Sequence, residues 1–150
     1  MQELKKFINK KTKVKESAMS KMNPVTHFEF PAEDKKRMVN FYTDVFGWQT
    51  QQLGPDMGEY VLVTTTESDE KGRPKMGGAI NGGFYQKTDD PLSHHPSVVI
   101  AVENINDSIK KVRAAGGKVT GEPMMIPGIG QFVSFEDTEG NRLSILQPLM

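Results

Sequence analysis

The segment Asn40-Phe41-Tyr42-Thr43-Asp44-Val45-Phe46-Gly47-Trp48 decides the fold that we expect for this chain. Apolar side chains in and just before it recur at the i, i+3, i+4 and i+7 spacing of a helix: Met38, Phe41, Tyr42 and Val45. Gly47 provides a stop signal after this run, and the acidic pair Glu33-Asp34 forms the predicted first turn. The segment Val25–Phe30, which ends at Pro31, predicts a strand that leads into the helix.

Three further extended segments follow the helix. They are Trp48–Leu53, Tyr60–Thr65 and about Met76–Phe84. The turn formers Gly54-Pro55-Asp56 and the polar stretch Ser68–Pro74 separate them. The first half of the chain therefore predicts one strand, one helix and then three strands.

The second half repeats this order of elements. Ser97–Val102 predicts a buried strand, and a helix with Asp107 near its start follows from the spacing of Ile105, Ile109 and Val112. Gly116-Gly117 ends that helix, as Gly47 ends the first, and the two stops are 70 residues apart. The strands predicted after it are Lys118–Gly121, about Ile129–Phe135 and Leu143–Leu146. The halves share few residues but the same plan, which indicates a duplication.

We expect an α+β fold in which two βαβββ modules pair edge to edge, because a sheet covered by one helix leaves its other face exposed. The result is a curved mixed sheet with helices outside and a central cleft, where ligands tend to bind. The modules span about 24–88 and 96–148 within one domain, 24–150. Residues 1–23 precede it as a basic extension, which we interpret as frayed or weakly docked, the alternative being a basic amphipathic helix that contacts a membrane or partner.

Composition excludes several classes of function. The 150 residues contain no cysteine, which excludes disulfides, thiolate zinc sites and cysteine nucleophiles. The longest aliphatic run, Val98–Val102, is far shorter than the roughly 20 residues of a membrane span. The first 23 residues carry seven lysines and two glutamates, so the remaining chain has a net charge of −5 and disfavours nucleic acid. The leader has no apolar stretch long enough for a secretory signal, so we expect a cytoplasmic protein.

Four stretches carry a resemblance to a known family: Thr26-His27-Phe28-Glu29, the segment from Asn40 to Trp48, Ala114-Ala115-Gly116-Gly117-Lys118-Val119, and Phe135-Glu136-Asp137-Thr138-Glu139-Gly140-Asn141. Together they resemble the vicinal oxygen chelate superfamily, which includes glyoxalase I, bleomycin-resistance proteins and extradiol dioxygenases. The last stretch resembles the family's turn before the final strand, with Thr138 where proline is usual. The resemblance covers about Asn23 to Pro148 and implies the fold; it leaves the reaction open, because the superfamily spans lyases, oxygenases, epimerases and pure binders.

Superfamily members that do metal chemistry place a His or Gln on the first strand of each module and a Glu on the last. The resemblance assigns these positions to His27, Ser97 and Ser144, and the fourth to the segment Met76–Gly82, which contains no carboxylate or imidazole. Because neutral hydroxyls hold a divalent transition ion poorly, we expect no catalytic metal and no other cofactor, with an atypical divalent metal site as the alternative. His94 and His95 are interpreted as solvated loop residues, since adjacent side chains of an extended chain point to opposite faces.

Strand alternation predicts which side chains face the cleft. If His27 faces it, Glu29 shares its side, while Phe28 and Phe30 pack under the helix. His27 and Glu29 would then be about 7 Å apart and form a water-bridged acid/base pair. The alternative is that Glu29 pairs with Arg142 or another cation and that His27 is a hydrogen-bonded core residue.

The residues that we expect to bind a ligand in the cleft are the following: His27, Glu29, Trp48, Tyr60, Ser97, Gln131, Arg142 and Ser144. Trp48 and Tyr60 suit a planar ligand, with a place in the core as the alternative reading. Gln131 ends a segment that resembles a cleft-rim hairpin of metal-free members of the family. Gly77-Gly78 and Gly82-Gly83 lack the lysine and the helix of a phosphate loop, and instead predict bulges or close approach of the backbone.

Two functions from different classes remain. The first is a glyoxalase/bleomycin-resistance-like protein that binds a small organic molecule in its cleft without a catalytic metal. The second is a lyase or isomerase of the same superfamily that uses His27 and Glu29 as catalytic residues, or an atypical metal site. A regulatory module acting through the basic extension ranks below both. The resemblance also implies a homodimer; no nucleic-acid or membrane partner is expected.

Overall fold

The computed structural model describes residue 2 and residues 22–150, so that most of the basic extension lies outside the described residues. The first module contains the following elements: β1 (Val25–Ala32), α2 (Lys35–Phe46), β2 (Gln49–Gln52), a 3₁₀ turn η1 (Pro55–Met57), β3 (Val61–Thr64) and β4 (Asn81–Gln86). After a second 3₁₀ turn, η2 (Pro91–His94), the second module contains these: β5 (Ser97–Ala101), α3 (Ile105–Ala114), β6 (Lys118–Ile126), β7 (Gly130–Glu136) and β8 (Arg142–Pro148). The order of strand, helix and three strands is the predicted one in both halves.

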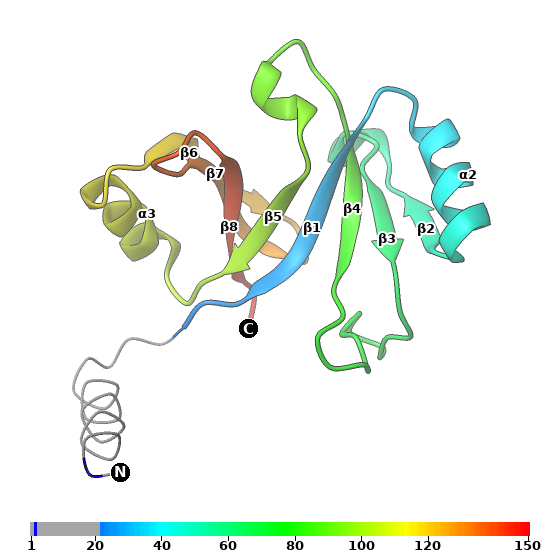
Figure 1. The fold of residues 1–150 in the computed structure, drawn as a ribbon, viewed down its shortest axis with the longest axis horizontal. Coiled ribbons are helices and arrows are strands. Elements are labelled where there is room, and N and C mark those ends of the chain that lie inside the picture. The colour runs from blue at the N-terminus through cyan, green and yellow to red at the C-terminus, as the bar shows by residue number, and fades with distance from the viewer. Residues whose placement is uncertain (1, 3–21) are drawn as a thin grey trace.

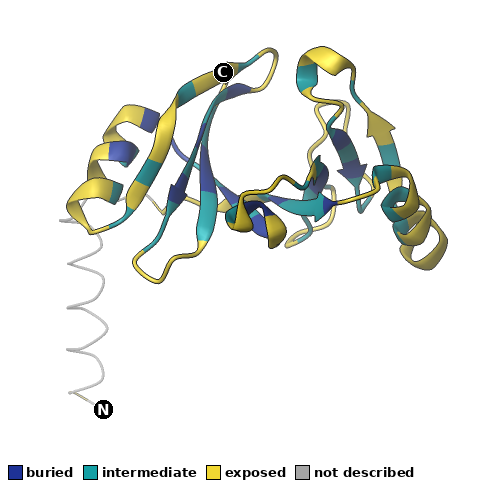
Figure 2. Cartoon of the chain, turned by 90° about the horizontal axis from the view of Figure 1, so that it is seen from above, coloured by how far each residue is buried: buried dark blue, intermediate teal, exposed yellow. Residues whose placement is uncertain are grey.

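The eight strands of residues 22–150 form one mixed sheet in the order β2-β3-β4-β1-β5-β8-β7-β6. Within each module the first strand runs parallel to the last, β1 to β4 and β5 to β8, and the modules meet where β1 pairs antiparallel with β5. The sheet is curved, and both helices lie on its outer side (Figures 1 and 2). This arrangement confirms the predicted α+β fold with helices outside.

The first helix begins and ends with specific capping contacts. A side-chain oxygen of Asp34 accepts a hydrogen bond from the backbone N–H of Arg37, so Asp34 is the N-cap and not, as predicted, part of the first turn. Gly47 ends the helix with φ of 70°, a conformation that costs glycine little. Phe41 and Val45, two of the four residues whose spacing predicted the helix, are exposed on α2.

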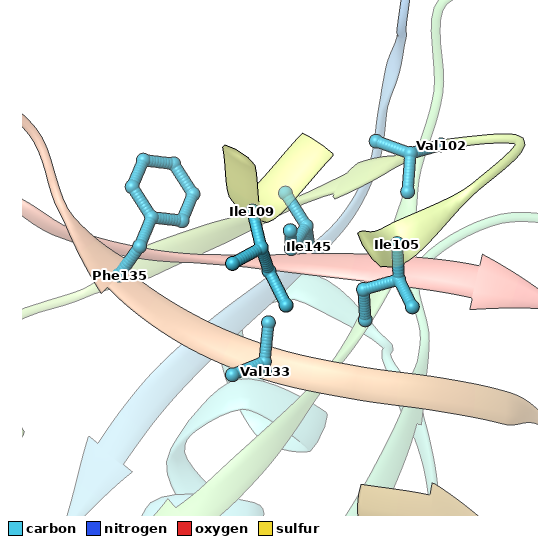
Figure 3. Close-up of a cluster of buried hydrophobic side chains, with 6 residues drawn as sticks. All are labelled: Val102, Ile105, Ile109, Val133, Phe135 and Ile145. Atoms are coloured by element: carbon cyan, nitrogen blue, oxygen red, sulfur yellow. The ribbon is translucent and has the colours of Figure 1, made fainter. Parts of the chain in front are cut away.

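Two hydrophobic clusters lie between the sheet and the helices. Under α2 the buried residues are Phe28, Val61, Val63 and Phe84. Under α3 they are Val102, Ile105, Ile109, Val133, Phe135 and Ile145 (Figure 3). The core therefore lies on the helix side of the sheet in both modules, and the opposite face is available for a site.

Two predicted strand boundaries are wrong by five residues. β4 begins at Asn81, five residues later than expected, because Met76–Ile80 contains a turn in which Ala79 donates to the carbonyl of Met76 and Gly78 has φ of 83°. β6 continues past Gly121 to Ile126, with an irregularity in its pairing to β7 between Thr120 and Met124. No helix in the described residues is long and apolar enough to cross a membrane.

Candidate functional site

The inner face of the curved sheet, which the helices leave uncovered, carries the candidate site; we call it the concave face. His27 and Glu29 of β1 lie on it, because Phe28 and Phe30 between and beyond them belong to the cluster under α2. Glu29 pairs with Gly83 of β4 on one side and with Ser97 of β5 on the other. Strand alternation thus places the histidine and the carboxylate on the same face of β1.

The imidazole of His27 contacts a tyrosine of the same module, Tyr60. Its Nε2 lies 3.0 Å from the hydroxyl oxygen of Tyr60, just before β3. Burial lowers the pKa of His27 to about 4, so the imidazole is neutral near neutral pH. A neutral imidazole whose Nε2 is engaged by a phenol matches the hydrogen-bonded alternative for this residue.

Tyr60 also interacts with Glu29. Burial raises the pKa of the Glu29 carboxyl above its usual value, while the positive charge of Arg142 and a hydrogen bond from Tyr60 act in the opposite direction. The pKa of Tyr60 is itself raised, first by burial and then by Glu29. A phenol has one proton; when Tyr60 donates it to Glu29, its oxygen accepts from Nε2–H of His27. His27, Tyr60 and Glu29 thus form one connected polar group.

A glycine on β4 makes room for this tyrosine. A Cβ atom at Gly83 would overlap the ring and hydroxyl of Tyr60. On the other face of the same strand, a Cβ at Gly82 would lie 2.5 Å from the ring of Phe28. The pair Gly82-Gly83 therefore serves the close approach that its position in a strand predicts, with one side chain packed over each face.

Arg142, the first residue of β8, lies on the same face. Its Nη2 donates to the Tyr85 hydroxyl at 2.9 Å, and its guanidinium carbon lies 5.2 Å from the centre of the Tyr85 ring. Burial raises the pKa of Tyr85, and Arg142 counteracts this. Tyr85 was missing from the predicted site; its signal is the alternation Asn81, Gly83, Tyr85, which becomes readable only once β4 is known to begin at Asn81.

The two predicted serines are buried and bonded to protein groups. Ser97 donates from Oγ to the carbonyl oxygen of Arg142 at 2.9 Å, and the Ser144 hydroxyl lies 3.1 Å from that of Ser134. Both are buried in the sheet. They help to fix β8 against its neighbours, and Ser97 sets the backbone at the base of Arg142.

Two residues predicted to line the cleft lie on the other side of the sheet. Trp48 stacks on Tyr42 of α2 with ring centres 4.7 Å apart and planes 8° apart, so its core alternative holds. Gln131 shares its face of β7 with Val133, a member of the cluster under α3, because the β7–β8 register runs without a bulge. His94 and His95 are exposed in and after η2, as predicted.

Cavities also open elsewhere among the described residues. One, of about 420 Å³, lies beside the start of α2, between Ala32, Phe41 and Lys87. Another, of about 440 Å³, lies between Gln49 and the Thr64–Ser68 segment. Neither is lined by His27, Glu29 or Arg142. The candidate site is therefore the concave face of the sheet itself.

Comparison with known proteins identifies the family. Residues 25–145 match the family model of the Glyoxalase/Bleomycin resistance protein/Dioxygenase superfamily. The chain belongs to this superfamily.

Curated members of the superfamily resemble parts of this chain. The "Glyoxylase-like domain-containing protein" of Didymella fabae is 28% identical over 122 residues, which are 81% of this chain and 91% of that protein. The "Putative glyoxylase CFP32" of Mycobacterium bovis is 35% identical over 74 residues, 49% of this chain. That match spans only 28% of the length of the mycobacterial protein.

Solved structures of the superfamily share the fold. Methylmalonyl-CoA epimerase from Mycobacterium tuberculosis superposes with a TM-score of 0.60 at 14% identity, covering 84% of this chain and 88% of that one. A glyoxalase/bleomycin resistance protein/dioxygenase superfamily member from Vibrio splendidus gives 0.55 at 17% identity, covering 84% and 99%. At these identities the likeness establishes the fold alone.

The residues present do not fit the metal site that the superfamily pattern implies. The two modules match in their register. In the second module the last-strand position, Ser144, pairs with the residue two after Ser97. In the first module the residue two after His27 is Glu29, and it pairs with Gly83. The fourth position is thus Gly83, not a residue of Met76–Gly82 as predicted, and Tyr60 fills the space where its side chain would be. Across residues 22–150 no group of three or more His, Cys, Asp or Glu side chains could hold a metal ion. One imidazole, two serines and a glycine are a poor donor set for a divalent cation.

Proposed function

We propose that this chain binds a small organic molecule on the concave face between its two modules, without a catalytic metal. One contact carries the proposal: the Nε2 atom of His27, the one strong donor at the four superfamily positions, lies 3.0 Å from the Tyr60 hydroxyl. A metal ion at Nε2 would have to displace that hydroxyl and would find no second imidazole or carboxylate at Gly83, Ser97 or Ser144.

The same face suits an organic ligand. It combines a neutral imidazole, two phenols, a carboxylate and a guanidinium from both modules, and all of these except the phenol of Tyr60, which lies just before β3, are placed on strands. Side chains on strands hold their positions better than side chains on loops, which favours a specific site. A few polar groups on a rigid frame are typical of small-molecule sites.

A thermal-shift screen tests the proposal. The protein is treated with EDTA, and its melting temperature is measured with a panel of organic metabolites and antibiotics. A ligand of the native state raises the melting temperature by mass action. We expect hits whose shift is unchanged by added metal, reduced in Glu29→Gln and retained in Glu122→Gln, a matched change at an exposed position on β6. Hits that appear only with added metal would contradict the proposal.

A second function has its own supporting observation. The pKa of Glu29 is raised mainly by burial, which moves this carboxyl toward the range in which it exchanges protons near neutral pH. A lyase or isomerase of the superfamily would use such a group as its acid/base catalyst, with His27 and Tyr60 beside it.

Isotope exchange separates the two functions. A ligand found in the screen is incubated with the protein in D₂O, and deuterium at its C–H positions is measured by mass spectrometry. A lyase or isomerase that removes a proton from carbon incorporates deuterium, and Glu29→Gln abolishes this incorporation. A pure binder leaves the ligand unlabelled. The homodimer and the cytoplasmic location stay predictions, the first tested by light scattering of the purified chain.

A further inference from the structure

The turn before β3 carries Tyr60 into the candidate site. It runs from η1 through Gly58 and Glu59, and both of these residues have positive φ, 62° and 53°. Of the residues that the structure describes, Glu59 is the one non-glycine residue with this backbone conformation. A residue with a Cβ atom adopts it only at an energetic cost, so contacts around the turn have to offset that cost. Because Glu59 directly precedes Tyr60, its backbone sets the direction in which the Tyr60 side chain leaves the chain.

A lysine of the first helix makes the contact that offsets this cost. Lys35 is the first residue of α2 and is half-buried. Its Nζ donates hydrogen bonds to the carbonyl oxygens of Gly58, at 3.2 Å, and of Glu59, at 2.9 Å. One ammonium group therefore bonds both residues of positive φ. Hydrogen bonds from a charged donor are about twice as strong as those between neutral groups.

Backbone hydrogen bonds join the turn to Tyr60 itself. The N–H of Glu59 donates to the carbonyl oxygen of Gly54 at 3.1 Å. The N–H of Tyr60 donates to the carbonyl oxygen of Met57 at 3.2 Å, and the Tyr60 carbonyl accepts from the N–H of Leu53 at 2.8 Å. The turn is thus closed on both sides of Glu59, so a change in its backbone is passed on to Tyr60.

The Tyr60 side chain tolerates little displacement at the other end of these contacts. Its ring lies so close to Gly83 that a Cβ atom there would overlap it. Its hydroxyl lies 3.0 Å from Nε2 of His27. A hydrogen bond is lost beyond about 3.5 Å, so a shift of the turn by about 1 Å would break this contact.

We propose that Lys35 is a positioning residue of the candidate site. It lies on α2, on the outer side of the sheet, and acts through the turn that it bonds (Figures 1 and 2). With the ammonium in place, the turn holds the Tyr60 hydroxyl against His27. Without it, the cost of the Glu59 conformation is no longer offset, and the turn relaxes and moves Tyr60 away. This inference rests on the proposed function, because it names a residue that determines the shape of that binding site.

An NMR double-mutant cycle tests the inference. The full chain is labelled with ¹³C and ¹⁵N, and two signals are recorded: the nuclear Overhauser effect between the rings of Tyr60 and His27, and the imidazole nitrogen shifts of His27. We expect Lys35→Met to weaken the Overhauser effect by roughly half or more and to change the nitrogen shifts, because the hydroxyl contact is lost. In a Tyr60→Phe background, Lys35→Met should change the nitrogen shifts much less, because the group through which Lys35 acts is already missing.

Two variants control for charge and for position. Lys35→Arg keeps a cationic donor at the same place and should retain both signals. Lys36→Met makes the same change at the exposed neighbouring position on α2 and should leave both signals unchanged. Lys35→Gln takes the place of Lys35→Met should the latter not fold.

Variants at Glu59, an exposed residue, test the backbone step separately. Glu59→Gly and Glu59→Asn tolerate positive φ, so each should retain the contact between Tyr60 and His27. Glu59→Val, whose β-branched side chain disfavours this conformation, should displace Tyr60. In a Glu59→Gly background the turn needs less support, so Lys35→Met should weaken the Overhauser effect less than it does in the unmodified chain.

Three results would overturn the inference. They are unchanged signals in Lys35→Met, an equal change in Lys36→Met, and an effect of Lys35→Met that is the same with and without the Tyr60 hydroxyl. Each of these leaves the proposed function standing, because it concerns the support of the site and not its ligand. A metal ion bound at His27 would instead refute the proposed function, while displacement of Tyr60 in Lys35→Met would still establish the positioning role.

Discussion

The Nε2 atom of His27 on β1 and the hydroxyl of Tyr60, 33 residues later, lie 3.0 Å apart on the concave face. In the superfamily pattern this imidazole is one of four metal-ligand positions. Here the Tyr60 hydroxyl contacts it instead, and the Tyr60 ring lies over Gly83, which occupies another of these four positions. Tyr60 therefore occupies the space that a metal ion and its ligand at position 83 would need. The same side chain connects His27 with Glu29.

The first prediction concerns the room that Gly83 provides. Gly83→Ala forces Tyr60 away from His27 and Glu29, because the new Cβ would overlap its ring. We expect the free energy of unfolding to fall by about 1–3 kcal/mol, the usual cost of overpacking. Urea denaturation measures it.

Two variants control this experiment. Gly77→Ala adds the same methyl group where nothing lies within 4 Å, and should leave stability nearly unchanged. In a Tyr60→Ala background, Gly83→Ala should cost less than half as much, because the overlapping ring is gone. Equal costs in both backgrounds would show that Tyr60 is not what Gly83 accommodates.

The second prediction is a pH dependence that originates in His27. Its pKa is lowered from 6.5 to about 4 by burial, so the unfolded chain binds more protons between these values. His27 therefore lowers stability as the pH falls from 6.5 toward 4, by at most about 3 kcal/mol. His27→Gln should flatten this part of the profile of unfolding free energy against pH. An NMR titration of the imidazole with a pKa near 6.5 would contradict the account.

Glu29 changes the pH dependence of stability in the opposite direction from His27, so a separate variant tests it. Its pKa is raised by burial, so the folded chain binds the extra proton above pH 4.5. Stability contributed by protonated Glu29 is complete below that pH and is lost as the pH rises through the folded pKa. Glu29→Gln should remove this loss and leave the His27 contribution in place. A profile that Glu29→Gln leaves unaltered would show that this carboxyl titrates normally.

The third prediction concerns the Tyr60 hydroxyl. Tyr60→Phe removes the group that contacts both His27 and Glu29, at almost constant volume. We expect a loss of about 1–3 kcal/mol, typical of polar groups left without a partner. The pKa of Glu29 should rise further, because the hydrogen bond from Tyr60 lowers it. Carboxyl ¹³C NMR measures this pKa, and an unchanged or lower value would contradict the proposed contact.

The fold followed from periodicity and from the repeated order of elements. The helix around Tyr42 with its stop at Gly47, and the second helix from Ile105, lie where the spacing placed them. Local pattern could not distinguish the turn at Met76–Ile80 from a strand, because its backbone is set by a hydrogen bond and by glycine φ. Nor could it show that Phe41 and Val45 are exposed.

The candidate site was predictable wherever alternation along a single strand decided the face. That logic placed His27 and Glu29 together, and Phe28 beneath the helix. It missed Tyr85, because the start of β4 was wrong, and it misplaced Gln131, whose face depends on the register of β7 against β8. The His27–Tyr60 contact joins β1 to the residue just before β3, and these two strands are not neighbours in the sheet, so no local pattern encodes the contact.

Metal titration tests the central claim most directly. Tag-free protein purified without added metal is subjected to elemental analysis, treated with EDTA and then titrated calorimetrically with Ni²⁺, Zn²⁺, Mn²⁺ and Fe²⁺. The account predicts no stoichiometric binding of any of the four, since Tyr60 engages His27 and the other positions are Gly83, Ser97 and Ser144. One ion bound tightly per chain, and lost in His27→Ala, would contradict it.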